Sequence, residues 1–273
     1  MSDSLAAERS VVRKRRRRPP RWVPDQHGAW AMLVVPFVVG SLIRVESREP
    51  AAFLIPLLGC WVAGYVAFYT ASGWLKAPPA RKASWVRPLL VSAALTLGAG
   101  MAAVGLSTPR LLWWLPAFVA VLVPSLDLAR RRRERHWLGG ALTVAAAAMM
   151  LLVARYPDPA TMVAAADLTP TLVSAGATFA YFFGTVLYVK TNIRERGNHR
   201  FLAASVGWHA VAMVAAATVA VAGLATWGWF MFFTATTIRA AVVPRRTPPF
   251  SPKALGLAEG ALSIALVLLA VLA

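Results

Sequence analysis

Cysteine is almost absent from this 273-residue sequence, which contains Cys60 alone. A single cysteine forms no disulfide within the chain and supplies no thiolate cluster for a zinc or iron–sulfur centre. The sequence also lacks a Walker A loop, an HExxH or CxxC pair and a GxSxG turn. The usual sequence evidence for nucleotide hydrolysis, metalloprotease chemistry and serine-hydrolase chemistry is therefore missing.

Acidic residues are scarce too, because 11 Asp and Glu face 29 Lys and Arg, giving a formal net charge of +18. No two carboxylates in the basic loops have a spacing suited to Mg²⁺. His27, His199 and His209 have no cysteine or carboxylate at a standard metal-ligand spacing. We therefore expect no bound metal and no cofactor.

Long apolar stretches make up most of the sequence, which is 58% hydrophobic and has a mean hydropathy of +0.59. A helix needs roughly 17–25 apolar residues to cross about 30 Å of hydrocarbon. The pattern predicts an all-α fold, a polytopic membrane helix bundle of about nine transmembrane helices without a separate soluble domain. The expected spans are residues 28–45, 51–72, 86–106, 111–127, 138–154, 168–189, 201–223, 224–243 and 254–272.

Lys and Arg are distributed unequally between the two sides of this pattern. Twenty-five of the 29 precede the first span or lie in the even-numbered loops, and the odd-numbered loops hold Arg44, Arg48, Arg110 and Arg155. Basic loops resist translocation, so we expect the N-terminus inside and the C-terminus outside a bacterial cytoplasmic (inner) membrane. The arginine-rich residues 1–24 are expected to be a disordered cytoplasmic tail, followed by a bundle domain over residues 25–273.

The same charge distribution bears on partners. Basic residues spread over short loops are suited to the anionic head groups of membrane lipids at the cytoplasmic face. We therefore expect lipids, and not nucleic acid, as the partners of the basic loops. A partner protein in the membrane is a further possibility that the sequence leaves open.

Three polar patches lie at the ends of spans on the predicted cytoplasmic side. His27 stands at the mouth of the first span. Asp127 lies one helical turn before Arg131, so the two are expected to pair. Lys190 and Arg194 are also one turn apart, with Glu195 beside them and a helix end predicted at Gly197-Asn198. Two cations at this spacing favour binding of a phosphate or carboxylate, although they also serve as topology anchors.

Two further ionisable residues fall inside predicted spans. His209 is eight residues into the seventh span, and Glu259 is five residues into the ninth. Ionisable groups at depth usually face the bundle interior, and they are functional candidates. His209 is the candidate catalytic residue, as a proton donor or acceptor, because imidazole exchanges protons near neutral pH. The loops on the predicted outer side are expected to be inert; the longest, residues 155–170, holds Asp158 and Asp167 but no clustered donors.

Parts of the sequence resemble the YwiC-like family of bacterial membrane proteins. The resemblance rests on Gln26-His27-Gly28-Ala29-Trp30-Ala31-Met32 followed by Pro36, on Arg131 to Arg135, and on Lys190 with Ile193 to Asn198. It extends over most of the chain from about Pro24 and excludes the arginine-rich leader. It implies an integral membrane protein and brings no established activity with it.

A second, architectural resemblance is to UbiA-type intramembrane prenyltransferases. Those enzymes have nine helices and hold Mg²⁺-diphosphate through Asp-rich motifs in the loops after helices 2 and 6. The matching loops here, Ser72 to Lys76 and Lys190 to Asn198, carry basic residues instead. This departure counts against metal-assisted prenyl transfer.

Together these observations predict a membrane protein with a cytoplasm-facing polar and basic pocket for an anionic lipid-like or small-molecule ligand. The expected ligand-binding residues are His27, Asp127, Arg131, Lys190, Arg194, Glu195, His209 and Glu259. Three alternatives stay open: a divergent UbiA-like transferase acting on an isoprenoid lipid, a transporter or permease, and an assembly partner of a membrane complex. Whether the protein is an enzyme is not decided by its sequence.

Overall fold

A computed structural model describes Trp22, residues 27–134 and residues 136–272, without the side chains of His27 and Gly28. The predicted tail, apart from Trp22, and Arg135 lie outside the described residues. Within these ranges the regular structure is helical, without strands. The helices are α2 (His27–Glu46), α3 (Leu54–Lys76), α4 (Pro79–Leu106), η2 (Pro109–Trp114), α5 (Leu115–Arg130), α6 (Trp137–Arg155), α7 (Pro159–Ala164), α8 (Leu168–Ile193), α9 (His199–Val221), α10 (Trp227–Val242), η3 (Val243–Arg245) and α11 (Pro252–Leu272).

Eight stretches of helix in the described chain are long and apolar enough to cross a membrane. They comprise α2, α3, α4, η2 with α5, α6, α8, α9 and α11, and they correspond to eight of the predicted spans. The remaining predicted span, residues 224–243, coincides with α10. That helix has 16 residues, so at 1.5 Å per residue it is about 24 Å long, shorter than the hydrocarbon layer. The prediction of a multi-pass helical bundle is confirmed in this coarser form.

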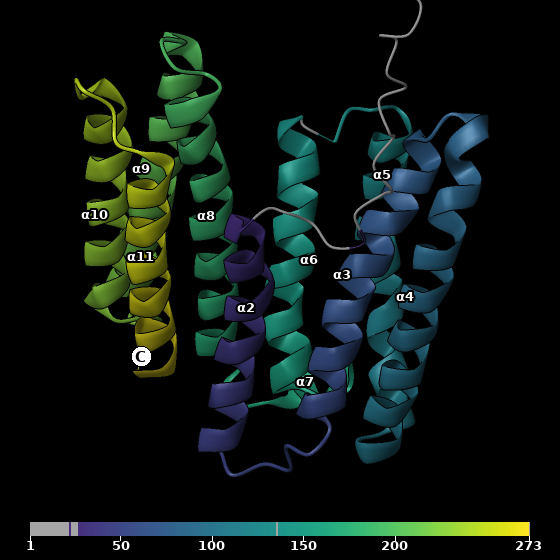
Figure 1. Ribbon diagram of the computed structural model, residues 1–273. Coiled ribbons are helices and arrows are strands. Elements are labelled where there is room, and N and C mark those ends of the chain that lie inside the picture. The colour runs from purple at the N-terminus through teal and green to yellow at the C-terminus, as the bar shows by residue number, and fades with distance from the viewer. Residues whose placement is uncertain (1–21, 23–26, 135, 273) are drawn as a thin grey trace, which may run out of the picture.

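Chain order and spatial order differ in the bundle (Figure 1). α3 packs against α4 and α5 on one side, and α9 and α10 pack against each other on the other side. α2, α6 and α8 lie between these groups. The first helix contacts α6 and the last helix, α11, more extensively than it contacts its successor α3. α8 contacts α6, α9, α10 and α11, and many of the buried side chains belong to it.

Local sequence signals explain where several helices end. Gly197, with a φ of +85°, separates α8 from α9. The side chain of Asn198 then accepts a hydrogen bond from the backbone N–H of Phe201 at 3.1 Å and caps α9. The helix end and turn predicted at Gly197-Asn198 are therefore confirmed. The tight turn predicted near Gly223 is present as well, with a φ of +70° at that glycine.

The centre of the bundle depends on a close approach between α2 and α6. Gly40 of α2 lies directly against the backbone carbonyl of Leu151 in α6, where a Cβ atom would overlap the carbonyl oxygen. Leu151 and the neighbouring Val39 are both fully buried. Because lipid offers helices no hydrophobic incentive to associate, such small-residue contacts allow backbones to pack closely.

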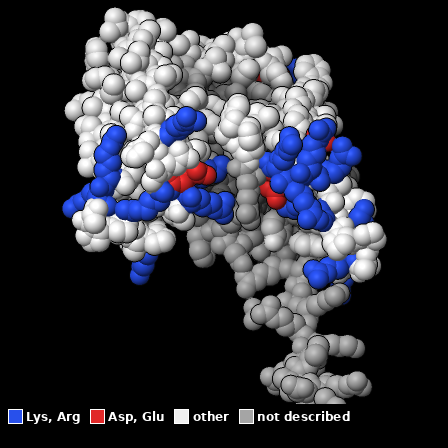
Figure 2. Space-filling view, turned by 90° about the horizontal axis from the view of Figure 1, so that it is seen from above, with Lys and Arg blue, Asp and Glu red and all other residues white. Residues whose placement is uncertain are grey.

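Basic residues gather at one end of the bundle, which we call the basic end and define by Lys76, Arg130 to Arg133, Arg194 and Arg245. Figure 2 looks onto this end and shows the Lys and Arg side chains in separate groups, with a few acidic side chains among them. The other end of the bundle, where Arg44 and Arg155 lie, is called the opposite end below.

Three ion pairs organise one part of the basic end. Asp127 pairs with Arg131 at 2.7 Å and with Arg130 at 3.0 Å, so the predicted pairing is present. Lys76 at the end of α3 pairs with Glu134 at 2.8 Å, and Arg132 donates to the Lys76 carbonyl at 3.0 Å. These contacts connect the α3–α4 loop to the α5–α6 loop. Exposed pairs of this kind contribute only about 0–1 kcal/mol each, so they orient the loops more than they stabilise the fold.

Candidate functional site

One face of α8 carries three hydroxyl groups near the basic end. Tyr181, Thr185 and Tyr188 recur at helical spacing, so they line the same side of the helix, and all three are buried. α10 and α11 both contact α8. This arrangement brings the hydroxyl groups to the two ionisable side chains on those helices, Arg239 and Glu259.

Glu259 of α11 is held by donors from two helices. Its Oε2 accepts hydrogen bonds from Thr185 Oγ1 at 2.8 Å and from the Tyr181 hydroxyl at 3.1 Å. Its Oε1 is paired with Nη1 of Arg239. The carboxylate side chain is 14% exposed, and a buried carboxylate is tolerated when it is paired and hydrogen-bonded in this way.

Arg239 of α10 is the cation of this cluster, and it is only partly satisfied. Its guanidinium carbon lies 4.2 Å from the centre of the Tyr188 ring, within the range of a cation–π contact. Nη1 is used by Glu259, whereas Nε and Nη2 are buried without a hydrogen-bond partner among the described residues. Nε and Nη2 form one edge of the planar guanidinium, so two adjacent N–H donors on that edge are left unpaired. Buried donors are ordinarily paired, and this edge therefore requires an explanation.

His209 of α9 lies beside this cluster and is 2% exposed. Its Nδ1 is 2.7 Å from the carbonyl oxygen of Ser205, and because a carbonyl only accepts, Nδ1 carries a proton. Nε2 is buried without a partner in the described chain. The ring fits against Gly184, where a Cβ would be 2.9 Å from Nε2. Gly184 directly precedes Thr185 in α8, which places the imidazole next to the cluster. These four-helix contacts define the Arg239 site: Tyr181, Thr185, Tyr188, His209, Arg239 and Glu259.

The other predicted ligand-binding residues lie elsewhere. Lys190 and Arg194 follow Val186 at four-residue spacing, and Val186 is the side chain nearest to Gly140 of α6. They therefore occupy a face of α8 that is turned away from Tyr181 and Tyr188. Arg194 is exposed and follows Lys190 by one helical turn.

The four other predicted residues, Glu195, Asp127, Arg131 and His27, differ in their surroundings. Glu195 accepts from the side chain of Asn198 at 2.9 Å. Asp127 and Arg131 belong to α5 and its following loop, which pack near α3 and α6. His27 is the first residue of α2, and its side chain lies outside the described residues.

Sequence reasoning identified His209 and Glu259 but missed Arg239 and the two tyrosines. The charge distribution assigned Arg239 to the basic loop that follows predicted span 224–243, because Arg239 lies four residues before the end of that span. The signal that could have found it is its position inside that span, where an arginine needs an acidic partner. Only the packing of α10 against α11 shows that this partner is Glu259.

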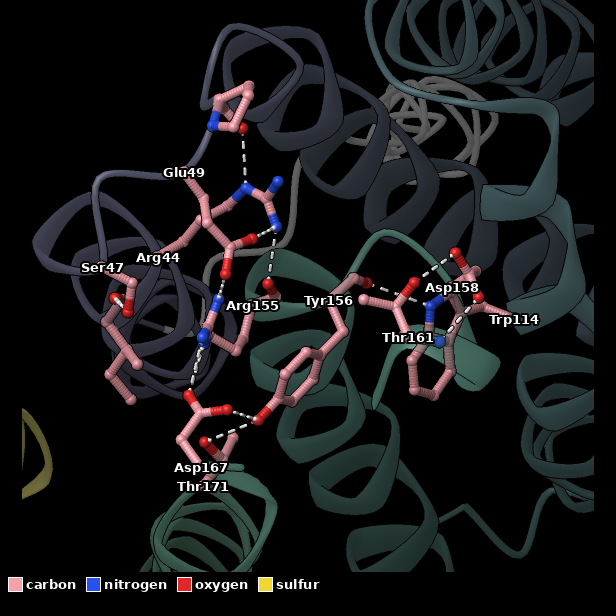
Figure 3. A network of polar contacts seen from close by, with 12 residues as sticks. Arg44, Ser47, Glu49, Trp114, Arg155, Tyr156, Asp158, Thr161, Asp167 and Thr171 are labelled. Carbon is pink, nitrogen blue, oxygen red and sulfur yellow. Dashed lines mark hydrogen bonds and ion pairs between the residues drawn. The ribbon is translucent and has the colours of Figure 1, made fainter. Parts of the chain in front are cut away.

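A second polar cluster occupies the opposite end, where the sequence predicted none (Figure 3). Arg155 pairs with Asp167 at 2.7 Å and with Glu49 at 2.5 Å, and Arg44 pairs with Glu49 at 2.9 Å. The Tyr156 hydroxyl donates to Asp167 at 2.8 Å. Both arginines are 5% exposed. The prediction that the loops at this end lack clustered donors is wrong. The fold brings Arg44 and Arg155, near the ends of α2 and α6, to the loop carboxylates of Glu49 and Asp167.

Protonation of this second cluster is expected to make stability depend on acid. Burial opposes ionisation of Asp167, but hydrogen bonds from Arg155 and Tyr156 outweigh it and hold the pKa of Asp167 below its ordinary value. Such a group stabilises the folded state above its unfolded pKa of about 3.9, and the contribution is lost as pH falls through the lower folded pKa. We expect thermal stability in detergent to fall below about pH 4, and to fall less steeply in Asp167→Asn. Equal acid dependence of the two proteins would contradict this assignment.

Comparison with known proteins finds a similar family and no solved relative. Residues 23–155 match the family model described as YwiC-like protein. The chain is 26% identical over 188 residues to the protein named "Uncharacterized protein YwiC" from Bacillus subtilis (strain 168), a match that covers 68% of this chain and 73% of that protein. No solved structure matches. The two matches confirm the resemblance seen in the sequence: this helical protein is similar to the YwiC-like family, by the family model over residues 23–155.

Proposed function

We propose that this protein binds an anionic ligand, a phosphate- or carboxylate-bearing lipid or small molecule, at the Arg239 site. The observation that carries the proposal is the unpaired Nε–Nη2 edge of Arg239. This edge is buried and has no hydrogen-bond partner among the described residues. Guanidinium binds carboxylates and phosphates through two parallel hydrogen bonds along one such edge. A buried edge without partners is therefore better suited to an oxyanion than to protein packing.

Charge balance supports the same ligand class. Glu259 compensates Arg239 in the absence of a ligand, and Thr185 and Tyr181 hold the carboxylate by hydrogen bonds. A bound anion would add a negative charge to the site. His209, whose Nε2 is unpaired, would compensate for that charge by accepting a proton. Lys190 and Arg194 would attract the anion at the basic end, on the other face of α8.

Binding at this site would be coupled to movement. Nε, Nη2 and the His209 Nε2 are shielded from solvent by protein atoms, so an anion reaches them only when a neighbouring side chain or helix shifts. Close packing makes such shifts discrete rather than gradual. This coupling is what a permease would need, and it favours transport over the transferase and assembly roles as the second candidate function.

The proposal includes a location. We place the protein in the bacterial cytoplasmic membrane with the basic end inside, in contact with anionic lipid head groups, and with α10 and η3 together forming a ninth span. η3 adds three residues, roughly 6 Å at about 2 Å per residue, which extends α10 to about 30 Å.

The test is mass spectrometry of lipids and small anions that copurify with the detergent-solubilised protein. Wild type would be compared with Arg239→Gln/Glu259→Gln, which removes both charges together, and with Lys190→Ala/Arg194→Ala. We expect one anionic species enriched in wild type and lost from Arg239→Gln/Glu259→Gln. Reduced recovery from Lys190→Ala/Arg194→Ala would assign those residues to attraction at the entrance.

Matched controls identify the source of the anion. Arg110→Gln changes an exposed arginine remote from the site and is expected to retain the bound species. A phospholipid or isoprenoid phosphate would indicate a lipid ligand, and a water-soluble species lost on dialysis would indicate a solute. Equal recovery of bulk lipid from all variants, with no other anion, would overturn the proposal.

A further inference from the structure

A cavity opens at the opposite end of the bundle, far along α8 from the Arg239 site. Its volume is about 320 Å³, at the lower end of the roughly 300–1,000 Å³ typical of small-molecule sites. Its walls come from the last turn of α2, the first turns of α8, the α9–α10 turn, and the facing ends of α10 and α11. Four segments distant in sequence therefore form one concave surface.

The charge around this cavity is negative. Glu46 and Asp167 line it, and no described lysine or arginine does so. Asp167 is already paired with Arg155, whose other partner, Glu49, also binds Arg44. That buried cluster is balanced, with two arginines and two carboxylates (Figure 3). Glu46 makes no ion pair with any described residue, so its charge is available to a ligand at the rim.

The inner wall is aromatic and hydroxyl-bearing. Trp229 lines the cavity, is 1% exposed, and donates no hydrogen bond from its indole N–H to a described residue. Ser174 and Thr171 line it as well, and both are buried. Leu224 and Val271 add apolar surface. An apolar wall with a carboxylate at the rim fits an organic cation, whose apolar body lies against the wall while its ammonium group pairs with the carboxylate.

We infer that this cavity is a second binding site, selective for a small organic cation whose apolar body enters between α2, α8 and α11. Its ammonium group binds Glu46, with Asp167 as the second carboxylate. Its body contacts Trp229, Leu224 and Val271. This site is separate from the anion site, so each proposal stands or falls by its own measurement.

Calorimetric titration of the detergent-solubilised full chain with benzyltrimethylammonium tests the inference at low ionic strength. We expect saturable binding to wild type and none of the benzenesulfonate anion, which is similar in size. Because exposed ion pairs contribute up to about 1 kcal/mol, Glu46→Gln should weaken the affinity about fivefold. Ala225→Leu, which adds volume to the cavity wall from the α9–α10 turn, should abolish binding.

Two controls make the result decisive. Glu134→Gln removes a carboxylate from the basic end and should bind the cation as wild type does. Thermal unfolding of each variant shows whether it is folded under the titration conditions. Absent binding to wild type, equal binding of benzenesulfonate, or unchanged affinity in both Glu46→Gln and Ala225→Leu would overturn the inference.

Discussion

Arg239→Gln is expected to unfold or severely destabilise the protein, because it leaves Glu259 in the membrane without its cation. Removing one partner of a buried ion pair costs about 3–5 kcal/mol, since the remaining charge is desolvated and unpaired. Glu259 is 14% exposed and keeps only its contacts with Tyr181 and Thr185. Thermal unfolding in detergent, together with the yield of monodisperse protein, measures the loss.

The matched control is Arg239→Gln/Glu259→Gln, in which both charges are absent. Replacing a whole buried pair is often close to neutral for stability, because the desolvation penalties disappear together. We therefore expect the double variant to recover most of the unfolding temperature while it loses the bound anion. If Arg239→Gln were as stable as wild type, the pair would not be buried in the way the structure indicates.

The second large effect is expected at Gly40→Ala. The new Cβ atom would overlap the carbonyl oxygen of Leu151 on α6, and a backbone atom cannot rotate away as a side chain can. Overpacking typically costs about 1–3 kcal/mol of stability. Because the clash at Gly40 is with a backbone atom, we expect its cost to lie at or above the top of that range. We expect separation of α2 from α6 and a marked drop in the unfolding temperature.

Gly98→Ala is the control for this substitution, because it makes the same chemical change in α4 with no atom within 4 Å of the added Cβ. A helical glycine replaced by alanine at an open position gains about 0.5–1 kcal/mol from its smaller loss of backbone entropy. The two variants should therefore move in opposite directions. A Gly40→Ala protein as stable as Gly98→Ala would contradict the close α2–α6 contact.

Much of the fold follows from composition and spacing along the chain. Apolar runs of spanning length predicted the helices, and Gly197-Asn198 predicted the end of α8 and the cap of α9. The lateral order of helices was not predictable, because apolar stripes facing lipid and apolar stripes facing other helices have similar sequences. The packing of α2 between α6 and α11 depends on shape, as at Gly40, and shape is not visible in a hydropathy pattern.

The candidate site was predictable only in part, for a related reason. His209 and Glu259 stood out because ionisable residues inside apolar runs are costly. Arg239 was hidden near the end of a run, where arginines usually anchor a helix. The Arg44–Glu49–Arg155–Asp167 cluster was hidden because its members are ordinary loop charges in sequence and become buried partners only in the fold.

The most direct test of the central claim is an experimental structure of the protein purified with its native lipids, at a resolution that shows the surroundings of Arg239. We predict a non-protein anion within hydrogen-bond distance of both Nε and Nη2, with Glu259 still bound to Nη1. A structure in which that edge of Arg239 is satisfied by protein groups alone, with no anion beside it, would contradict the proposed function.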